Sequence, residues 1–172
     1  MNPGLYNITI YQGSTWNYDF IVVTDSNSDL VDFTNKSFRM QIREDYSTAS
    51  IIDLTTANSK LIQTNGADKG TWVISTAYVT NDIVLYGTTY YICDTGNTGE
   101  LPTNTSYWSV YKQLLFNLSS TDTEGLIAND YLYDLEVVDA TVTPNIIDKI
   151  LKGTFRINAE VTKWLIQLII IV

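Results

Sequence analysis

The sequence predicts an all-β protein: an antiparallel β-sandwich that carries a small inserted β module. Residue types that favour strands are common, including 12 tyrosines among 172 residues. Short segments in which apolar and polar residues alternate recur along the chain. No helical repeat is long enough to cross over between parallel strands, so we expect antiparallel sheets.

The first part of the chain contains three predicted strands. Residues 6–11 alternate apolar and polar side chains, as a half-buried strand does. Residues 37–43 alternate most clearly, with apolar side chains on one face and Arg39, Gln41 and Arg43 on the other. We expect the two arginines to pair with nearby carboxylates. The strand between these two carries its large apolar side chains on one face: Trp16, Tyr18, Phe20 and Val22.

A short acidic segment between these strands resembles the start of a calcium-binding loop. Asp25, Asn27 and Asp29 place oxygen-bearing side chains at alternate positions. The helix-loop-helix version of such a loop needs glycine at its sixth position and glutamate at its twelfth. The chain has Leu30 and Lys36 there. We therefore predict a solvated turn and no metal site.

An interrupted hairpin predicts the inserted module. Residues 51–54 and 61–63 are predicted strands, and a tight-turn signal, Asn65-Gly66, follows. The matching partner strand appears only at residues 114–118, after an aromatic-rich passage. Insertions are tolerated best at exposed hairpin tips. The prediction is a discontinuous sandwich, residues 1–68 and 112–172, with an inserted β module, residues 69–111.

The remaining chain completes the sandwich. Hydroxyl and acidic residues at 119–126 predict one short helical turn. Residues 131–138 predict a long strand whose buried face carries Tyr131, Tyr133, Leu135 and Val137. A turn around Pro144 leads to the last predicted strand, within residues 150–157.

The apolar tail must be buried, and we expect homo-oligomerisation through the sandwich edges or through this tail. Exposed, it would be prone to aggregate, so either its own sandwich or another subunit must cover it. Strand addition to a neighbouring copy would give a homo-oligomer. The tail is shorter than the roughly 20 residues of a membrane helix, so we expect no membrane insertion. The residues assigned to assembly are Trp164, Leu165, Ile166, Leu168, Ile169, Ile170 and Ile171.

The composition argues against an enzyme. The chain has no histidine and one cysteine, Cys93, which lies in an apolar segment without a neighbouring base. Asp134 and Glu136 could serve glycoside hydrolysis as a carboxylate pair, but they lie on a polar strand face in a generally acidic chain. The net charge of −9 opposes nucleic-acid binding. We expect no cofactor, no metal and no requirement for an oxidising compartment.

Several segments outside the predicted insert resemble structural modules of tailed-phage particles. These segments, in order, are residues 38–43, 54–58, 118–123, 131–136 and 153–162. The resemblance implies an immunoglobulin-like or related sandwich that assembles with other virion proteins in a tail, baseplate or fibre adaptor. Capsid decoration or a head fibre is the alternative position. It also implies a protein that is assembled into particles in the host cytoplasm.

The predicted insert resembles small chitin- and cellulose-binding modules. The matching positions are Trp72, Ala77, Tyr78, Asp82, Ile83, Val84, Tyr86, Gly87, Tyr90, Tyr91, Gly99, Pro102 and Trp108. Those modules present a pair of adjacent aromatics where this chain has residues 94–97, which include none. We expect Trp72, Tyr91 and Trp108 to form the core of the insert and residues 95–105 to form an exposed loop. The candidate ligand-binding residues are Tyr78, Tyr86, Tyr90, Thr95 and Asn97.

Two functional hypotheses follow. In the first, the protein is a virion structural component whose sandwich binds other particle proteins. In the second, it is a host-recognition protein whose insert binds surface polysaccharide. The two are compatible, because a particle protein can carry a receptor-binding module.

Overall fold

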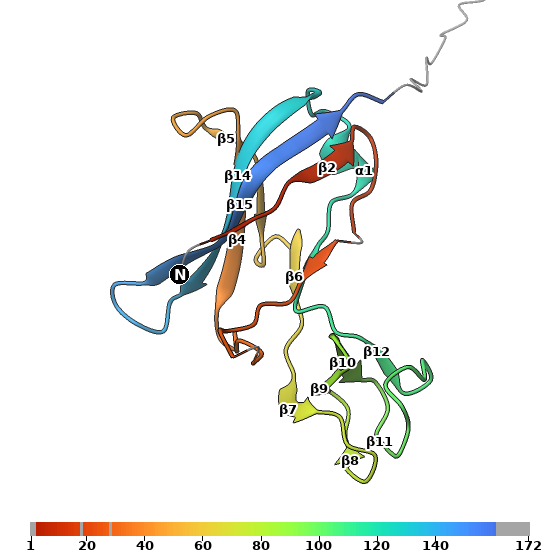
Figure 1. Ribbon diagram of the computed structural model, residues 1–172. Helices are drawn as coiled ribbons and strands as arrows, with labels where there is room; N and C mark the ends of the chain where they lie inside the picture. Colours follow the sequence, from red (N-terminus) through yellow and green to blue (C-terminus); the bar gives the residue numbers. More distant parts are fainter. Residues whose placement is uncertain (1–2, 18, 28, 161–172) are drawn as a thin grey trace, which may run out of the picture.

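A computed structural model describes residues 3–17, 19–27 and 29–160. The fold is all-β, as the sequence predicts (Figure 1). The one helix of the described part, α1 (Ser120–Thr123), has four residues, and nothing in that part forms an apolar helix of membrane-spanning length.

The larger sheet contains six strands in the order β1-β15-β14-β4-β5, with β2 also paired to β15. The alternating segments predicted from the sequence form its centre, because each has one apolar face to bury. Phe38, Met40 and Ile42 are buried on β4, and Tyr131, Tyr133, Leu135 and Val137 are buried on β14. The strands are β1 (Gly4–Leu5), β2 (Ile8–Tyr11), β4 (Ser37–Arg43), β5 (Ser50–Thr55), β14 (Asn129–Asp139) and β15 (Ile146–Asn158).

The prediction of purely antiparallel sheets is wrong. β1 and β2 both run parallel to β15, with Gly4 opposite Leu151 and Ile8 opposite Phe155. We expected no parallel strands because no helical repeat in the sequence is long enough to cross over between them. Here the first and last strands are neighbours, and the whole intervening chain connects them, so parallel pairing needs no crossover helix.

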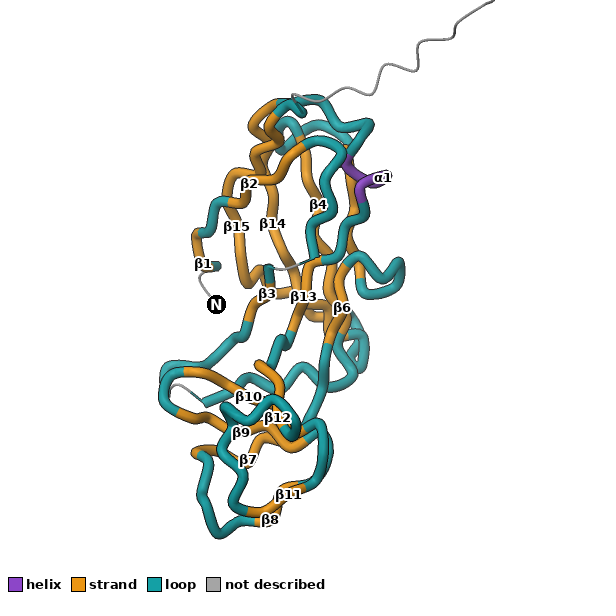
Figure 2. Tube along the Cα trace, turned by 90° about the vertical axis from the view of Figure 1, so that its right-hand side faces the viewer, coloured by secondary structure: helices purple, strands orange, loops and turns teal. Residues whose placement is uncertain are grey.

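The smaller sheet has the order β3-β13-β6 and faces the larger one (Figure 2). β3 is Phe20–Ile21, β6 is Leu61–Gln63 and β13 is Leu114–Phe116. The predicted antiparallel pairing across the interruption is present, with Leu114 opposite Gln63 and Phe116 opposite Leu61. The two sheets share one hydrophobic cluster, in which Trp16 stacks on Phe116 at 4.7 Å and meets Phe155 edge-on at 5.6 Å.

The predicted strand over residues 16–22 is much shorter than expected, and its side chains do not share one face. Trp16 is buried, whereas Phe20 is 38% exposed; Tyr18 lies outside the described residues. The described contacts with the strand after the insert are a bridge from Trp16 to Leu118, a bond from the Phe116 N–H to the Asp19 carbonyl (3.1 Å) and the two-residue β3. The Asp19 carboxylate accepts the indole N–H of Trp16 (2.7 Å), which holds that ring in the core.

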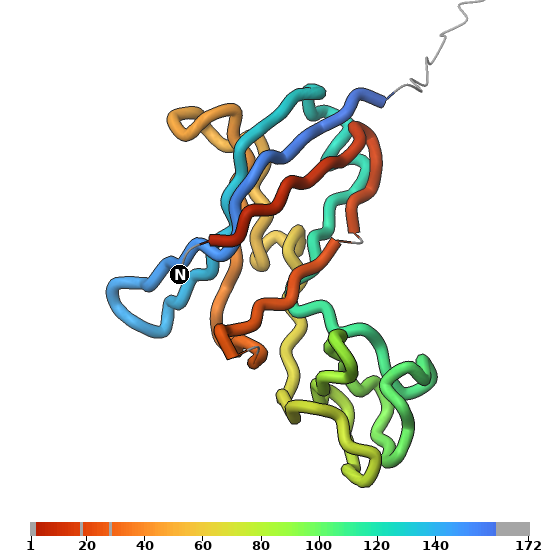
Figure 3. Tube along the Cα trace, viewed as in Figure 1, coloured from red at the N-terminus to blue at the C-terminus, as the bar shows by residue number. Residues whose placement is uncertain are grey.

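The chain between β6 and β13 folds as a separate group of short strands at one end of the molecule (Figure 3). One sheet has the order β12-β10-β9-β7, and β8 pairs with β11. β7 spans the predicted boundary between residues 68 and 69 and runs parallel to β9. The strands are β7 (Ala67–Thr71), β8 (Ala77–Tyr78), β9 (Asp82–Tyr86), β10 (Thr89–Cys93), β11 (Asn97–Thr98) and β12 (Trp108–Val110).

This group of strands has its own small core. Tyr78, Val84, Cys93 and Trp108 are buried together, and Trp72, Tyr91 and Tyr107 pack against them. The expected core roles of Trp72, Tyr91 and Trp108 are therefore confirmed. Burial raises the pKa of the Cys93 thiol, so this cysteine packs as a small apolar side chain.

A second apolar contact joins the insert to the body. Ile83, Ile92 and Tyr111 are buried against Val22 and Leu30 of the body. The Tyr111 hydroxyl donates a hydrogen bond to the Thr64 carbonyl (2.8 Å), which ties the outgoing and returning connections together. The insert is thus attached through packing as well as through its two connections.

The predicted helical turn is α1. Ser119 caps it: its hydroxyl accepts the Asp122 N–H, and the Asp122 carboxylate accepts the Ser119 N–H (2.9 Å). This reciprocal pair is a capping box. The helix occupies the corner between β13 and β14.

Candidate binding surface

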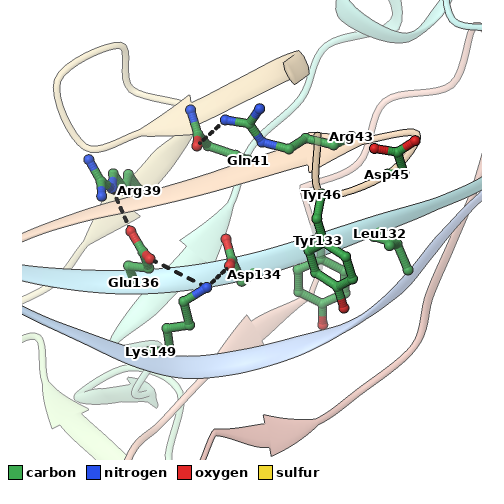
Figure 4. Close-up of a pocket in the computed structure, with 10 residues that line it drawn as sticks. All are labelled: Arg39, Gln41, Arg43, Asp45, Tyr46, Leu132, Tyr133, Asp134, Glu136 and Lys149. Carbon is green, nitrogen blue, oxygen red and sulfur yellow. Dashed lines mark hydrogen bonds and ion pairs between the residues drawn. The ribbon is translucent and has the colours of Figure 1, made fainter. Parts of the chain in front are cut away.

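The outer face of the larger sheet carries a groove of about 280 Å³. The side chains come from β4, β14 and β15 and from the loop between β4 and β5 (Figure 4). Its lining residues are Arg39, Gln41, Arg43, Asp45, Tyr46, Leu132, Tyr133, Asp134, Glu136 and Lys149.

Strand alternation places the polar side chains on this face. Because Phe38, Met40 and Ile42 point into the core, Arg39, Gln41 and Arg43 point outward. The same alternation on β14 puts Asp134 and Glu136 outside, opposite Gln41 and Arg39 on β4.

Cross-strand ion pairs connect these side chains. Arg39 Nε lies 2.6 Å from Glu136 Oε2, and Lys149 Nζ lies 3.8 Å from Glu136 Oε1. Lys149 also donates to Asp134, and this hydrogen bond raises the pKa of Lys149. Each carboxylate of the pair considered for glycoside hydrolysis therefore faces a cation, which favours a role in holding the sheet together over proton transfer.

The β4–β5 loop displays Tyr46 over the groove. Tyr46 is 87% exposed. The preceding Asp45 accepts hydrogen bonds from the Ser47 amide and hydroxyl, both at 2.6 Å, and the Ser47 bond lowers the pKa of Asp45. The Arg43 guanidinium donates to the Thr48 carbonyl and to the Gln41 side chain (2.8 Å). The loop is thus supported from both sides.

Arg43 differs from the prediction for the two arginines. Arg39 pairs with a carboxylate as expected, but Arg43 binds a carbonyl and an amide oxygen. The difference follows from the hairpin, whose tight loop brings its own carbonyl groups close to the end of β4.

A second hollow of about 380 Å³ lies on the other side of Tyr46. It shares Tyr46, Leu132, Tyr133, Asp134 and Lys149 with the first. Its own wall adds Pro3, Leu5, Asn7, Lys152, Gly153 and Thr154. The two hollows form one surface that runs past Tyr46 across the sheet.

Tyr133 lines the bottom of this surface, and it is also a buried residue of the hydrophobic core. Its hydroxyl donates to the Tyr6 carbonyl (2.7 Å), and burial raises its pKa. The strand β14 is thereby fixed to the segment between β1 and β2.

The candidate residues of the insert do not gather on one surface. Tyr78 is only 3% exposed, and its hydroxyl accepts the Val73 N–H (2.7 Å), so its ring belongs to the core of the insert. Tyr86 is half-buried, edge-on to Trp72 at 5.5 Å. Tyr90 packs at the junction with the body, where burial raises its pKa. No two of these tyrosines form a flat platform.

The loop that follows β10 is largely exposed, as expected. Thr95 is exposed, and its carbonyl accepts the Asn97 side-chain amide (3.0 Å). Asn97 is half-buried and belongs to β11, which pairs with β8. Its side-chain oxygen is buried without a hydrogen-bond partner.

Tyr46 was missed by the sequence analysis. The available signal was its position: a large aromatic residue between Asp45 and Ser47, in a polar stretch joining two predicted strands. Aromatic residues at such loop positions have little to bury against and can be presented to solvent.

The remaining predicted sites can be placed only in part. Asp25 forms a turn, accepting hydrogen bonds from the backbone of Asn27 (2.8 Å) and Asp29 (3.0 Å). Within residues 3–17, 19–27 and 29–160, no group of three or more acidic, cysteine or histidine side chains is arranged to hold a metal. The assembly residues, Trp164 to Ile171, lie outside the described residues.

No family model, curated protein or solved structure shows a significant match to this chain.

Proposed function

We propose that this protein is a structural component of a tailed-phage particle, placed in the tail, baseplate or a fibre adaptor. Its body binds other particle proteins, and the insert projects from one end. Capsid decoration or a head fibre is the alternative position. The main support is the position of the phage-like segments in the fold. Residues 38–43, 131–136 and 153–158 lie on three adjacent strands, β4, β14 and β15. These three strands are the centre of the larger sheet.

We further propose that the body is immunoglobulin-like. The strand orders support this, because β2-β15-β14-β4-β5 facing β3-β13-β6 corresponds to an A′GFCC′ sheet facing a BED sheet. In that correspondence the insert lies between strands D and E.

A hydrogen bond at the corner before β14 also supports this assignment. Immunoglobulin-like sandwiches carry a tyrosine near the start of strand F whose hydroxyl bonds to the backbone a few residues upstream. Tyr131 occupies this position, and its hydroxyl donates to the Ile127 carbonyl at 2.9 Å.

The virion proposal is tested on intact particles with an antibody against residues 70–111. Label on the tail tip or fibres would support the adaptor position, and label spread over the head would support decoration. Absence of both label and the protein's peptides from purified particles would overturn the proposal.

The proposed homo-oligomer is tested separately. The full chain and a variant that ends at residue 160 are compared by light scattering over a range of concentrations. We expect the full chain to associate and the shortened chain to be monomeric. A monomeric full chain would remove the tail from the proposal without affecting the particle test.

Glycan binding through the insert is a second candidate function. The observations that favour it are the exposed loop carrying Thr95 and, at the opposite end of the β9–β10 hairpin, the half-buried ring of Tyr86. Loss of polysaccharide binding in Tyr86→Ala, with retained binding in an exposed-tyrosine control such as Tyr11→Ala, would support it.

A further inference from the structure

We propose that the surface around Tyr46 on the larger sheet binds a neutral, linear oligosaccharide, with the Tyr46 ring as the stacking platform. This site lies on the body and is separate from the glycan surface considered for the insert. It does not depend on the virion proposal.

Tyr46 has the exposure and the support that a stacking residue needs. Tyr46 is 87% exposed, and the loop that carries it is held by the hydrogen bonds of Asp45 and Arg43. A loop that is already held loses little backbone conformational entropy when a ligand packs on its aromatic ring. Among the residues that the structure describes, no tyrosine of the insert is as exposed as Tyr46.

Polar side chains lie beside this platform in rows set by the strands. Gln41, Asp134 and Lys149 come from β4, β14 and β15, which are neighbours in the sheet. A carboxylate accepts about four hydrogen bonds and an ammonium donates three. The ion pairs use only part of this capacity, so hydroxyl groups of a ligand can bind without breaking them.

The charge of the groove favours a neutral ligand. The groove lining holds three cations (Arg39, Arg43, Lys149) and three anions (Asp45, Asp134, Glu136), and the second hollow adds one cation, Lys152, so the whole surface carries a net charge of +1 on a chain of net charge −9. A charged ligand would gain little net attraction from these groups, and an anion would be repelled by the whole protein. A sugar ring combines an apolar face for stacking with a rim of uncharged hydroxyl groups.

The shape of the surface favours an extended ligand. The hollows of about 280 and 380 Å³ lie on either side of Tyr46 and share five lining residues. A chain of sugar rings can follow both hollows while one ring stacks on Tyr46.

A peptide strand fits this surface less well. Added strands bind mainly through the backbone of a free sheet edge. β4 pairs with β14 and β5, and β14 pairs with β4 and β15, so both strands have neighbours on each side. The groove therefore offers side chains rather than a backbone ladder.

The test is calorimetric titration of the full chain with three neutral probes: cellohexaose, chitohexaose and maltohexaose. We expect one of them to bind, and Tyr46→Ala to weaken its affinity at least about tenfold, or ~1.4 kcal/mol. Tyr46→Phe keeps the ring and should retain binding within about threefold. Tyr11→Ala is the matched control, because Tyr11 is exposed but lines neither hollow, and it should leave the affinity unchanged.

Three results would overturn the proposal. The first is no heat of binding with any probe up to about 10 mM, a ceiling that corresponds to a very weak complex. The second is equal affinity for the native chain and Tyr46→Ala, with both shown to be folded by circular dichroism. The third is loss of binding in Tyr86→Ala but not in Tyr46→Ala, which would place the site on the insert.

Discussion

Gln113 connects separate backbone segments within the body, near the return of the chain from the insert. The side chain is 3% exposed, accepts the Val23 N–H (2.8 Å) and donates to the Val31 carbonyl (2.6 Å). Gln113→Leu would leave both backbone groups without partners, so we expect unfolding free energy to fall by about 1–3 kcal/mol. Urea denaturation measures this change.

The control for this prediction is Gln41→Leu on the outer sheet face. Gln41 is only partly buried, and water can replace its hydrogen bonds. If Gln41→Leu lowered the unfolding free energy as much as Gln113→Leu, burial of the amide would not explain the effect.

Asp122 should make stability depend on acid pH. Hydrogen bonds from Lys60 and then from Ser119 lower its pKa from 3.8 to about 2. A folded-state pKa below the unfolded one stabilises the protein above about pH 4, and this contribution is lost as the pH falls from about 4 through 2. We expect Asp122→Asn to cost about 1 kcal/mol at pH 7 through the capping box and the ion pair, and less at pH 2.

Denaturant midpoints measured between pH 7 and pH 2 test this expectation. Asp130→Asn removes a more exposed ion pair with Arg156 and should change the midpoint less. A cost of Asp122→Asn that stays constant across this pH range would contradict the assignment.

At the scale of elements, the sequence predicted strands better than their pairing. β4 and β14 were predictable because alternating apolar and polar residues show which face of a strand is buried. α1 was predictable because its capping residues are close together in the sequence. The parallel pairing of β2 with β15 joins residues at opposite ends of the chain, and no local pattern encodes it. The position of Tyr46 over the sheet was likewise unpredictable, because it depends on how the β4–β5 loop lies over β14 and β15.

The segment between β1 and β2 runs alongside β15 and passes Gly153 so closely that only glycine fits there. A Cβ atom at Gly153 would lie 2.0 Å from the Tyr6 carbonyl oxygen, which also accepts the Tyr133 hydroxyl. We expect Gly153→Ala to displace this segment and to lower unfolding free energy by about 1–3 kcal/mol. Thermal denaturation checks the effect.

Gly125→Ala is the matched control, since a Cβ there meets nothing within 4 Å. It should be neutral or slightly stabilising, because alanine restricts the unfolded chain. Equal destabilisation by the two substitutions would refute the steric explanation.

At the scale of the whole molecule, the body keeps its hairpin partners on both sides of a long insertion. β6 and β13 pair directly although residues 64–113 separate them. If this pairing is independent of the insert, replacing residues 65–112 with a two-residue Asn-Gly turn should leave the body folded. Gln113 and its hydrogen bonds are retained in this variant.

The shortened chain should nevertheless be less stable than the full one. Val22 and Leu30 would lose their packing against Ile83, Ile92 and Tyr111, so apolar surface on the body would become exposed. We expect a single cooperative transition at a lower temperature, together with retained near-ultraviolet circular dichroism from the buried Trp16. Loss of that signal would mean that β6 and β13 pair only when the insert holds the body around them, and the insert would then be part of one folding unit.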